Sequence, residues 1–291
     1  MGLHINQYIE NSIRQNWEEL ALTDFKGVSY QYKDIARKIA KLHILFEETG
    51  IKPGDKVALC GRNSSQWAVA MFGALTFGAI PVPILHEFKP DNIHHLVNQC
   101  DARLFFVDQT IWENLDSSHF EKLIGVLHIS DYSILLSNDK KLDNARKHLN
   151  ELFGKKYPER FTPADVKYAT PDRDSLALIN YTSGSMGFSK GVMIPYRAMW
   201  GNLDFANQVM SKILKPGGNT ISILPMAHMY GMAFEFIVEF MSGCHIFYLT
   251  RIPSPAVVAQ ALSDIKPIII IAVPLVIEKI IKKKVLPKLD T

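Results

Sequence analysis

The segment YTSGSMGFSKGVM, residues 181–193, determines how the rest of this chain is interpreted. It follows an apolar run at residues 176–179 and combines hydroxyl groups, glycines and one cation. Glycines permit positive φ, so consecutive backbone N–H groups can converge on an anion, and hydroxyl and ammonium groups add donors and charge. The sequence therefore predicts a phosphate-binding loop after a buried strand. Its contributing residues are Thr182, Ser183, Gly184, Ser185, Gly187, Lys190 and Gly191.

Two common phosphate-binding motifs do not fit this segment. A Walker A loop ends in Gly-Lys followed by Ser or Thr, whereas here Ser189 precedes Lys190 and Gly191 follows it. The chain also has no G-x-G-x-x-G element that opens a helix, so a dinucleotide-binding fold has no support. The remaining alternative is a surface loop rich in Gly and Ser. The order of residue types along the segment favours the phosphate loop.

The segment resembles the signature loop of the adenylate-forming superfamily, which includes acyl-CoA synthetases, luciferases and the adenylation domains of peptide synthetases. Members read close to YTSG, then Ser or Thr, then TGxPKGV. This chain differs at Met186, where threonine is usual, and at Ser189, where proline is usual. A lost hydroxyl donor to a charged phosphate corresponds to about 1.5–3 kcal/mol. A lost proline corresponds to about 0.4–1 kcal/mol of preorganisation, so the two changes point to weaker or slower nucleotide use.

Three other segments carry the same resemblance. The run ILPMAHMYGM, residues 223–232, is similar to a family segment that borders the acid substrate, and it contains His228. The run KPIIIIAVPLVIEKI, residues 266–280, resembles a pattern seen especially in long-chain fatty acid CoA ligases. Residues 50–84 resemble the opening βα unit of the family. The resemblance extends from about residue 28 to residue 282, which is most of the chain.

The resemblance implies ATP-dependent activation of a fatty acid to an acyl adenylate, followed by thioester formation with coenzyme A. It thereby implies ATP, Mg²⁺ and coenzyme A, with a fatty acid as substrate. The candidate catalytic residues are Lys190 and His228. The candidate nucleotide-binding residues are Thr182, Ser183, Gly184, Ser185, Met186, Gly187 and Lys190. The candidate residues of the substrate pocket are His228, Met229, Tyr230, Gly231 and Met232.

Two roles stay open for His228 and for the apolar residues around it. In the family segment the histidine lies at the mouth of the acid pocket; alternatively, it caps a helix that begins near Tyr230. The neighbouring thioether and aromatic side chains would line a channel for an alkyl chain or would fill the core. These side chains are Met226, Met229, Met232, Phe234 and Phe236.

Family members contain further segments that residues 1–291 lack. These are a Gly-Tyr-Gly-x-Thr-Glu segment whose Glu helps to hold Mg²⁺, a Thr-Gly-Asp segment whose Asp binds ribose, and a C-terminal lid with a catalytic lysine. We therefore expect the N-terminal portion of a long-chain acyl-CoA synthetase, inactive without its missing C-terminal half. The rival hypothesis is a non-catalytic remnant of the fold that binds a nucleotide or an acyl group. A third hypothesis is a ligase that loads a carrier protein.

The composition is that of an ordinary globular protein, with 47% hydrophobic and 21% charged residues. The formal charge of +3 provides no basic footprint for nucleic acid. We expect Cys60, Cys100 and Cys244 to be buried thiols in a reducing compartment, because they are far apart in apolar surroundings. The N-terminus has no secretory signal pattern, so a cytoplasmic location is expected.

One segment, residues 67–85, lacks charge and is long enough to cross a bilayer. Gly73, Gly78, Pro81 and Pro83 interrupt it, so we predict a buried helix followed by a buried strand. A group of lysines near the end of the chain either touches an anionic membrane surface, giving weak peripheral contact, or forms a solvated helix end. These lysines are Lys279, Lys282, Lys283, Lys284 and Lys288.

Short apolar runs alternate with amphipathic stretches along the chain, which is typical of sheets covered by helices. The runs are near-continuous, so the predicted fold class is α/β, with layered, mostly parallel sheets flanked by helices. Helices are predicted at residues 32–48, 65–77, 91–99, 142–153, 197–209, 230–241, 254–263 and 275–284. Strands are predicted at residues 56–60, 103–107, 126–129, 176–180, 220–223, 246–249 and 268–272.

The composition also predicts two subdomains. Residues 1–165 form the first α/β subdomain, a charged connecting segment covers about residues 138–174, and residues 166–291 form the second subdomain with the phosphate loop. No metal site made of side chains alone is expected. His94 and His95 are adjacent on a predicted helix and point to different sides, and His86 lacks a second histidine four residues later.

Overall fold

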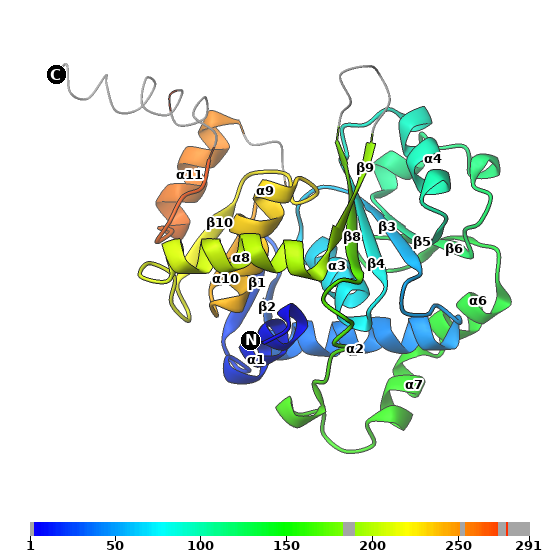
Figure 1. Cartoon of the computed structure of the whole chain (residues 1–291), viewed down its shortest axis with the longest axis horizontal. Helices are drawn as coiled ribbons and strands as arrows, with labels where there is room; N and C mark the ends of the chain where they lie inside the picture. Colours follow the sequence, from blue (N-terminus) through cyan, green and yellow to red (C-terminus); the bar gives the residue numbers. More distant parts are fainter. Residues whose placement is uncertain (1–2, 183–189, 251–253, 273–277, 279–291) are drawn as a thin grey trace.

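The computed structural model describes residues 3–182, 190–250, 254–272 and 278. Two sheets, a separate hairpin and the surrounding helices make up this part of the chain (Figure 1). Sheet A has the strand order β10-β11-β1-β2, in which β1 and β11 as well as β10 and β11 run parallel, whereas β1 and β2 run antiparallel. Its strands are β1 (Leu20–Asp24), β2 (Ser29–Gln31), β10 (Asn219–Ser222) and β11 (His245–Tyr248).

Sheet B has the strand order β4-β3-β5-β6-β7. All neighbours are parallel except β6 and β7, which are antiparallel. Nearly every residue of β3, β4 and β5 is buried, as expected for parallel strands covered on both faces. The strands are β3 (Lys56–Cys60), β4 (Ile80–Ile84), β5 (Ala102–Val107), β6 (Gly125–His128) and β7 (Ile134–Ser137).

A two-stranded antiparallel hairpin joins β8 (Leu176–Thr182) to β9 (Lys190–Pro195). Strand β8 lies beside β4, so the hairpin stands against the edge of sheet B (Figure 1). The last paired residues of the hairpin are Thr182 and Lys190. The fold therefore places the two ends of the predicted phosphate loop side by side.

Helix α3 (Ser65–Phe77) lies between the two sheets, because it contacts β1 of sheet A and both β3 and β4 of sheet B. It is apolar on all sides, and Trp67 and Phe72 are fully buried, as expected for a helix enclosed by other layers. The Ser64 hydroxyl accepts a hydrogen bond from Trp67 N at 3.1 Å at the start of the helix. Gly78, with φ of +86°, ends it in the left-handed conformation.

The other helices surround the sheets (Figure 1), and α2 and the segment η3–α10 pack directly on α3. The segments α9, η3 and α10 follow one another without a break, and η3 has π-helical hydrogen bonding. The α-helices are α1 (Ile5–Gln15), α2 (Tyr32–Glu48), α4 (Pro90–Gln99), α5 (Gln109–Trp112), α6 (Lys140–Lys147), α7 (Leu149–Lys156), α8 (Tyr196–Met210), α9 (Met229–Met232), α10 (Val238–Met241) and α11 (Pro255–Ile265). The short segments are η1 (Ser117–His119), η2 (Pro163–Asp165) and η3 (Ala233–Ile237).

The predicted α/β class with mostly parallel sheets is confirmed. The structure has the predicted helices at residues 32–48 and 65–77 and the predicted strand at residues 56–60 with unchanged bounds. The uncharged segment at residues 67–85 is a buried helix and a buried strand, as predicted. Among the described residues, the structure has no helix with the length and apolarity that a membrane crossing requires.

Two predicted elements differ from the structure. The helix predicted at residues 142–153 is two helices, α6 and α7, because His148 has φ of −101° and ψ of 15°, outside the helical range. The strand predicted at residues 268–272 is absent. Ile268 N donates to Asn219 O at 2.9 Å, but this single hydrogen bond is not continued into a ladder along β10. Apart from residue 278, the helix predicted at residues 275–284 lies outside the described residues.

Sheet A takes strands from both sides of the predicted boundary between residues 1–165 and 166–291. Leu22 and Ile246 are partners in the β1–β11 ladder. The division into two subdomains at this boundary stays a prediction, and the sheet shows how closely the two parts are joined. The predicted burial of Cys60, Cys100 and Cys244 is confirmed. Burial raises the pKa of the Cys100 thiol to about 11 and that of the Cys244 thiol to about 12.

Candidate functional site

The β8–β9 hairpin holds the ends of the candidate phosphate loop. Thr182 and Lys190 are directly paired across the hairpin, and both are exposed. Their side chains are thus available to a ligand at the loop end of the hairpin. The other candidate nucleotide-binding residues lie outside the described part of the chain; they are Ser183, Gly184, Ser185, Met186 and Gly187.

Gly191 has a packing role that its place in the sequence motif does not suggest. It lies in β9 opposite Tyr181, and it is not among the described glycines with positive φ. A Cβ atom at Gly191 would lie 3.0 Å from Tyr181 Cε1 and 3.2 Å from Ile179 Cγ2. The missing side chain therefore leaves room for the Tyr181 ring, which packs into the core beneath the hairpin.

The turn that follows β10 carries His228, and the amide of Asn63 holds this turn in place. Asn63 Nδ2 donates to Leu224 O at 2.7 Å and to Ser222 Oγ at 3.1 Å, while Met226 N donates to Asn63 Oδ1 at 2.9 Å. Asn63 is buried and comes directly before α3. A loop of the first half of the chain thus fixes the segment predicted to border the acid substrate.

Asn180 joins the same turn to the hairpin. Its Nδ2 donates to Ala227 O at 2.8 Å, and the side chain is 6% exposed. Asn180 is two residues before Thr182 on β8, and Ala227 precedes His228. This bond brings the base of the candidate phosphate loop and the candidate substrate segment together in space.

His228 begins helix α9 as its N-cap residue. Its Nδ1 accepts a hydrogen bond from Tyr230 N at 3.3 Å, and the side chain is exposed. A neutral imidazole that accepts through Nδ1 carries its proton on Nε2, so the outward nitrogen is a donor. The capping role left open by the sequence is therefore present. A contact with the substrate is compatible with it and stays a prediction.

The candidate pocket residues differ in exposure. His228 and Tyr230 are exposed, Met229 is half-buried, and Gly231 and Met232 are buried. A Cβ atom at Gly231 would lie 2.7 Å from Pro225 O, so only glycine fits where the helix packs on the turn.

The proposed acyl channel is also divided between core and surface. Met226, Met232 and Phe236 are at most 1% exposed and belong to the hydrophobic core, where Phe236 lies 4.5 Å from the Phe72 ring. For these three side chains the structure agrees with the alternative of core packing. Met229 and Phe234 are only partly buried, and their place in a channel stays a prediction.

A buried acid, Glu235, was not among the predicted site residues. Its Oε2 accepts hydrogen bonds from Leu224 N at 2.8 Å and Ile223 N at 3.0 Å, and it receives a longer one from Ser222 Oγ at 3.4 Å. Burial raises the pKa of Glu235 well above its usual range, although the hydrogen bonds from Leu224, Ile223 and Ser222 oppose this. The sequence signal was present, since Glu235 and Glu239 are four residues apart within an apolar helical segment.

The histidines considered for metal binding contact a backbone N–H group, solvent or a neighbouring side chain. His94 is buried and its Nε2 accepts a hydrogen bond from Asp116 N at 3.1 Å, whereas His95 is exposed on another side of α4. His86 lies 3.4 Å from Glu87, its neighbour in the chain. Within the described ranges, no group of three or more His, Cys, Asp or Glu residues could hold a metal ion.

Comparison with protein families gives one match over nearly the whole chain. A family described as AMP-binding enzyme matches residues 9–290. A long-chain-fatty-acid–CoA ligase of Escherichia coli O157:H7 is 26% identical over 265 residues, which cover 83% of this chain and 46% of that protein. The chain thus spans about half the length of the curated relatives it matches.

Solved structures show the same fold. An anthranilate CoA ligase, AuaEII, in complex with anthranoyl-AMP superposes with a TM-score of 0.75 at 17% identity over 91% of this chain and 48% of that one. ATP-bound MatB from Rhodopseudomonas palustris superposes with a TM-score of 0.72 at 16% identity over 97% of this chain and 52% of that one.

Proposed function

Because the chain belongs to the family of AMP-binding enzymes, we propose that it is the N-terminal part of a ligase that activates a fatty acid with ATP and transfers it to coenzyme A. The observation that supports this most directly is the Asn180–Ala227 hydrogen bond of 2.8 Å. It joins the hairpin that ends in Thr182 and Lys190 to the turn that carries His228. A nucleotide and a carboxylic acid bound to these two segments would therefore be neighbours.

The reaction starts from a carboxylate, which is a poor electrophile. One of its oxygens attacks the α-phosphorus of ATP, and pyrophosphate leaves as the acyl adenylate forms. The thiol of coenzyme A then attacks the acyl carbon and AMP leaves, with the thiol proton passing to solvent or to a base. Catalysis of this kind depends on positioning and on stabilisation of charge. Lys190 offsets the charge on the departing pyrophosphate, and Mg²⁺ enters with the nucleotide.

Residues 183–187 supply the remaining phosphate contacts in this proposal, through backbone N–H groups and the hydroxyls of Ser183 and Ser185. His228 directs its Nε2 donor toward the acid or the adenylate. The similarity to a long-chain-fatty-acid–CoA ligase supports a fatty acid as substrate. The missing threonine hydroxyl at Met186 favours a second candidate, a non-catalytic protein of the same fold that binds a nucleotide or an acyl group.

Binding of ATP to this chain tests the nucleotide site. We expect Lys190→Gln to weaken ATP binding about tenfold, because a charge-assisted hydrogen bond is lost. Lys212→Gln removes an exposed lysine just after α8, away from the hairpin, and is the matched control. Equal ATP affinity of Lys190→Gln and the unchanged chain, measured by isothermal titration calorimetry, would contradict the proposed loop.

Exchange of labelled pyrophosphate into ATP separates the two candidates. A protein that contains this chain together with a C-terminal half should catalyse exchange that depends on added fatty acid. The His228→Ala variant should reduce this exchange. Nucleotide binding without exchange, across acids from short to long chains, would favour the non-catalytic candidate.

A further inference from the structure

A polar cavity lies away from the hairpin, between α2, α6, α7 and the turn that joins β6 to β7. Its volume is about 280 Å³. In Figure 1 these elements lie at the lower right, whereas the end of β8 and the start of β9 point upward. The cavity is therefore distinct from the candidate nucleotide site. Its lining residues that matter here are Lys38, Lys41, Asp131, Tyr132, Arg146 and Lys147.

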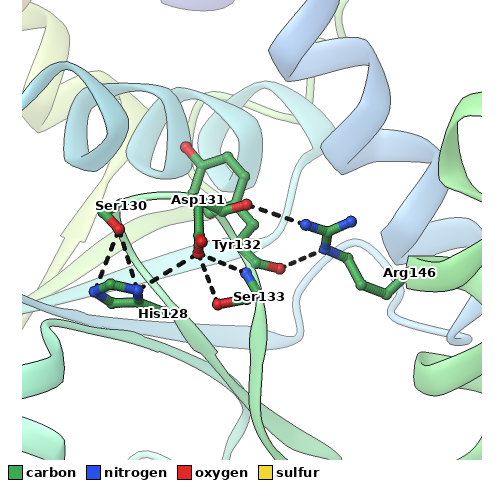
Figure 2. A network of polar contacts seen from close by, with 6 residues as sticks. All are labelled: His128, Ser130, Asp131, Tyr132, Ser133 and Arg146. Atoms are coloured by element: carbon green, nitrogen blue, oxygen red, sulfur yellow. Dashed lines mark hydrogen bonds and ion pairs between the residues drawn. The ribbon is translucent and has the colours of Figure 1, made fainter.

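Four cations line this cavity against one carboxylate, and one oxygen of that carboxylate already has protein partners. Asp131 accepts hydrogen bonds from Ser133 N at 2.9 Å and Ser133 Oγ at 2.7 Å, and its Oδ1 lies 3.5 Å from His128 Nδ1. Figure 2 shows the carboxylate on the His128 side of the turn and the Asp131 carbonyl on the Arg146 side. The Asp131 charge interacts with that of Arg146 and so compensates only part of the charge of the four cations.

The cations themselves have neutral partners. Lys41 Nζ donates to Asn150 Oδ1 at 2.7 Å, and Lys38 Nζ lies 3.5 Å from Gln66 Oε1. Lys147 has no hydrogen bond to another described side chain. Within the described residues, none of the four cations forms an ion pair with an N–O separation of 4.0 Å or less. The positive charge around the cavity is therefore not neutralised by close contacts.

Arg146 is held in position before any ligand arrives. Its Nε donates to Tyr132 O at 2.6 Å and its Nη2 donates to Asp131 O at 3.2 Å (Figure 2). The turn that presents these carbonyls has Tyr132 at φ of +58°, and the Tyr132 hydroxyl donates to Gln66 O at 2.7 Å. The Nη1 group has no protein partner among the described residues and is free to donate. A guanidinium fixed in this way is suited to bind an oxyanion.

The lysines carry an electrostatic cost that an anion would relieve. Burial, and secondly the Lys41 charge, lower the pKa of Lys38. Burial, followed by the charges of Arg146 and Arg37, lowers the pKa of Lys41. Like charges in a partly buried cavity disfavour one another, and an anion between them would favour all of the charged forms.

We propose that this cavity binds a small phosphate-bearing anion. Donors converge on it from two directions, the lysines of α2 and the Arg146 and Lys147 side chains of α6, which suits a tetrahedral group with several oxygens. Leu42, Tyr132 and Leu149 form an apolar wall beside the cations, so an organic phosphate fits as well as an inorganic one. The hollow shape favours a small molecule over a flat anionic membrane.

Calorimetric titration with inorganic pyrophosphate and, separately, with glycerol 3-phosphate tests the cavity. All proteins carry Lys190→Gln, which weakens binding at the hairpin. We expect Lys41→Gln combined with Lys147→Gln to weaken binding about tenfold or more, because two charge-assisted contacts are lost. Lys140→Gln combined with Lys141→Gln removes two exposed lysines of the same helix that do not line the cavity, and should change the affinity less than about twofold.

Lys147→Gln alone is a second variant that should leave folding intact, because this exposed side chain has no hydrogen bond or ion pair with other described residues. This single variant should also weaken the binding of pyrophosphate and glycerol 3-phosphate. Tighter binding of glycerol 3-phosphate than of pyrophosphate would identify an organic phosphate as the ligand, and the reverse an inorganic one. Equal losses in both lysine pairs, or no binding of either probe, would overturn the proposal. Binding only to vesicles that contain phosphatidylglycerol would overturn it as well.

Discussion

At the scale of single residues, two buried carboxyl groups distinguish the helix that follows His228. Glu235 accepts the backbone N–H groups of residues 223 and 224, and Glu239 Oε2 accepts a hydrogen bond from Thr220 Oγ1 at 2.7 Å. Both acids come from the continuous helix α9–η3–α10, and its π-helical part contains Glu235. Segments with π-helical bonding are frequent at functional sites, and here the segment lies beside the turn of the candidate substrate residues.

Glu239 gives the stability of the protein a pH dependence. Burial raises its pKa to about 8, against 4.5 in an exposed state, and the Thr220 hydrogen bond only partly opposes this. The folded chain thus holds a proton that the unfolded chain has lost. The contribution of Glu239 to the free energy of unfolding is fully present below about pH 4.5. It is lost as the pH rises toward 8, at up to about 1.4 kcal/mol per pH unit.

We predict that Glu239→Gln removes this dependence. Glutamine has the shape of the protonated acid and keeps an acceptor for Thr220, but it does not ionise. Urea unfolding at pH 5.5 and pH 8 should show a smaller loss of unfolding free energy for the variant than for the unchanged chain. Glu121→Gln, at an exposed position, should behave like the unchanged chain. Parallel pH profiles of Glu239→Gln and the unchanged chain would show that Glu239 titrates normally.

At the scale of elements, two glycines near helices have opposite requirements. Gly78 ends α3 with φ of +86°, and its neighbours at Pro53, Ala169 and Pro171 leave ordinary contact distances for a Cβ atom. Gly154 lies inside α7, and nothing described lies within 4 Å of a Cβ atom built there. The effect of a substitution on stability is therefore set by the backbone conformation at Gly78. At Gly154 it is set by the backbone entropy that the helix costs.

We predict opposite signs for the two alanine substitutions. Gly78→Ala should destabilise the protein by about 1–2 kcal/mol, because alanine is strained in the left-handed region. Gly154→Ala should stabilise it by about 0.5–1 kcal/mol, because alanine loses less entropy in a helix. Urea unfolding midpoints measure both. A loss of stability for Gly154→Ala comparable to that of Gly78→Ala would show that α7 tolerates no side chain there.

At the scale of the whole molecule, the beginning and the end of the described chain share one sheet and one core. Strand β1 pairs with β11, and α1 contacts α10. Ser12 Oγ donates to Phe240 O at 2.6 Å, and the Tyr32 hydroxyl donates to Cys244 O at 2.8 Å. These buried hydrogen bonds connect segments more than 200 residues apart in the sequence.

We predict that a fragment of residues 1–165 does not fold on its own. It keeps all five strands of sheet B, but of sheet A it keeps only β1 and β2, a two-stranded hairpin that is marginal in water. It also exposes the surfaces of α1, α3 and β1 that η3, α10 and β11 cover. Circular dichroism during urea titration should show no cooperative transition. Co-expression with residues 166–291 controls for the break in the chain and should restore the transition. A cooperative transition of the isolated fragment would support two independent subdomains.

The sequence by itself determined the features that depend on near neighbours. Apolar stripes and stop signals gave the helices at residues 32–48 and 65–77, and uninterrupted apolar runs gave the strand at residues 56–60 and the parallel character of the sheets. Family-like segments, above all residues 181–193, indicated the family that the match over residues 9–290 shows. These features can be predicted from the sequence because helix periodicity and motif chemistry are properties of short stretches.

Only the tertiary structure decided which distant residues meet. The bonds from Asn63 and Asn180 to the turn before His228, and the partnership of β1 with β11, depend on how the layers pack. The same holds for the cations of α2 and α6 that surround one cavity. A sequence pattern indicates which face of an element is buried, but it does not indicate which other element packs against that face. Contacts between elements are fixed when the whole core closes and each buried polar group finds its partner.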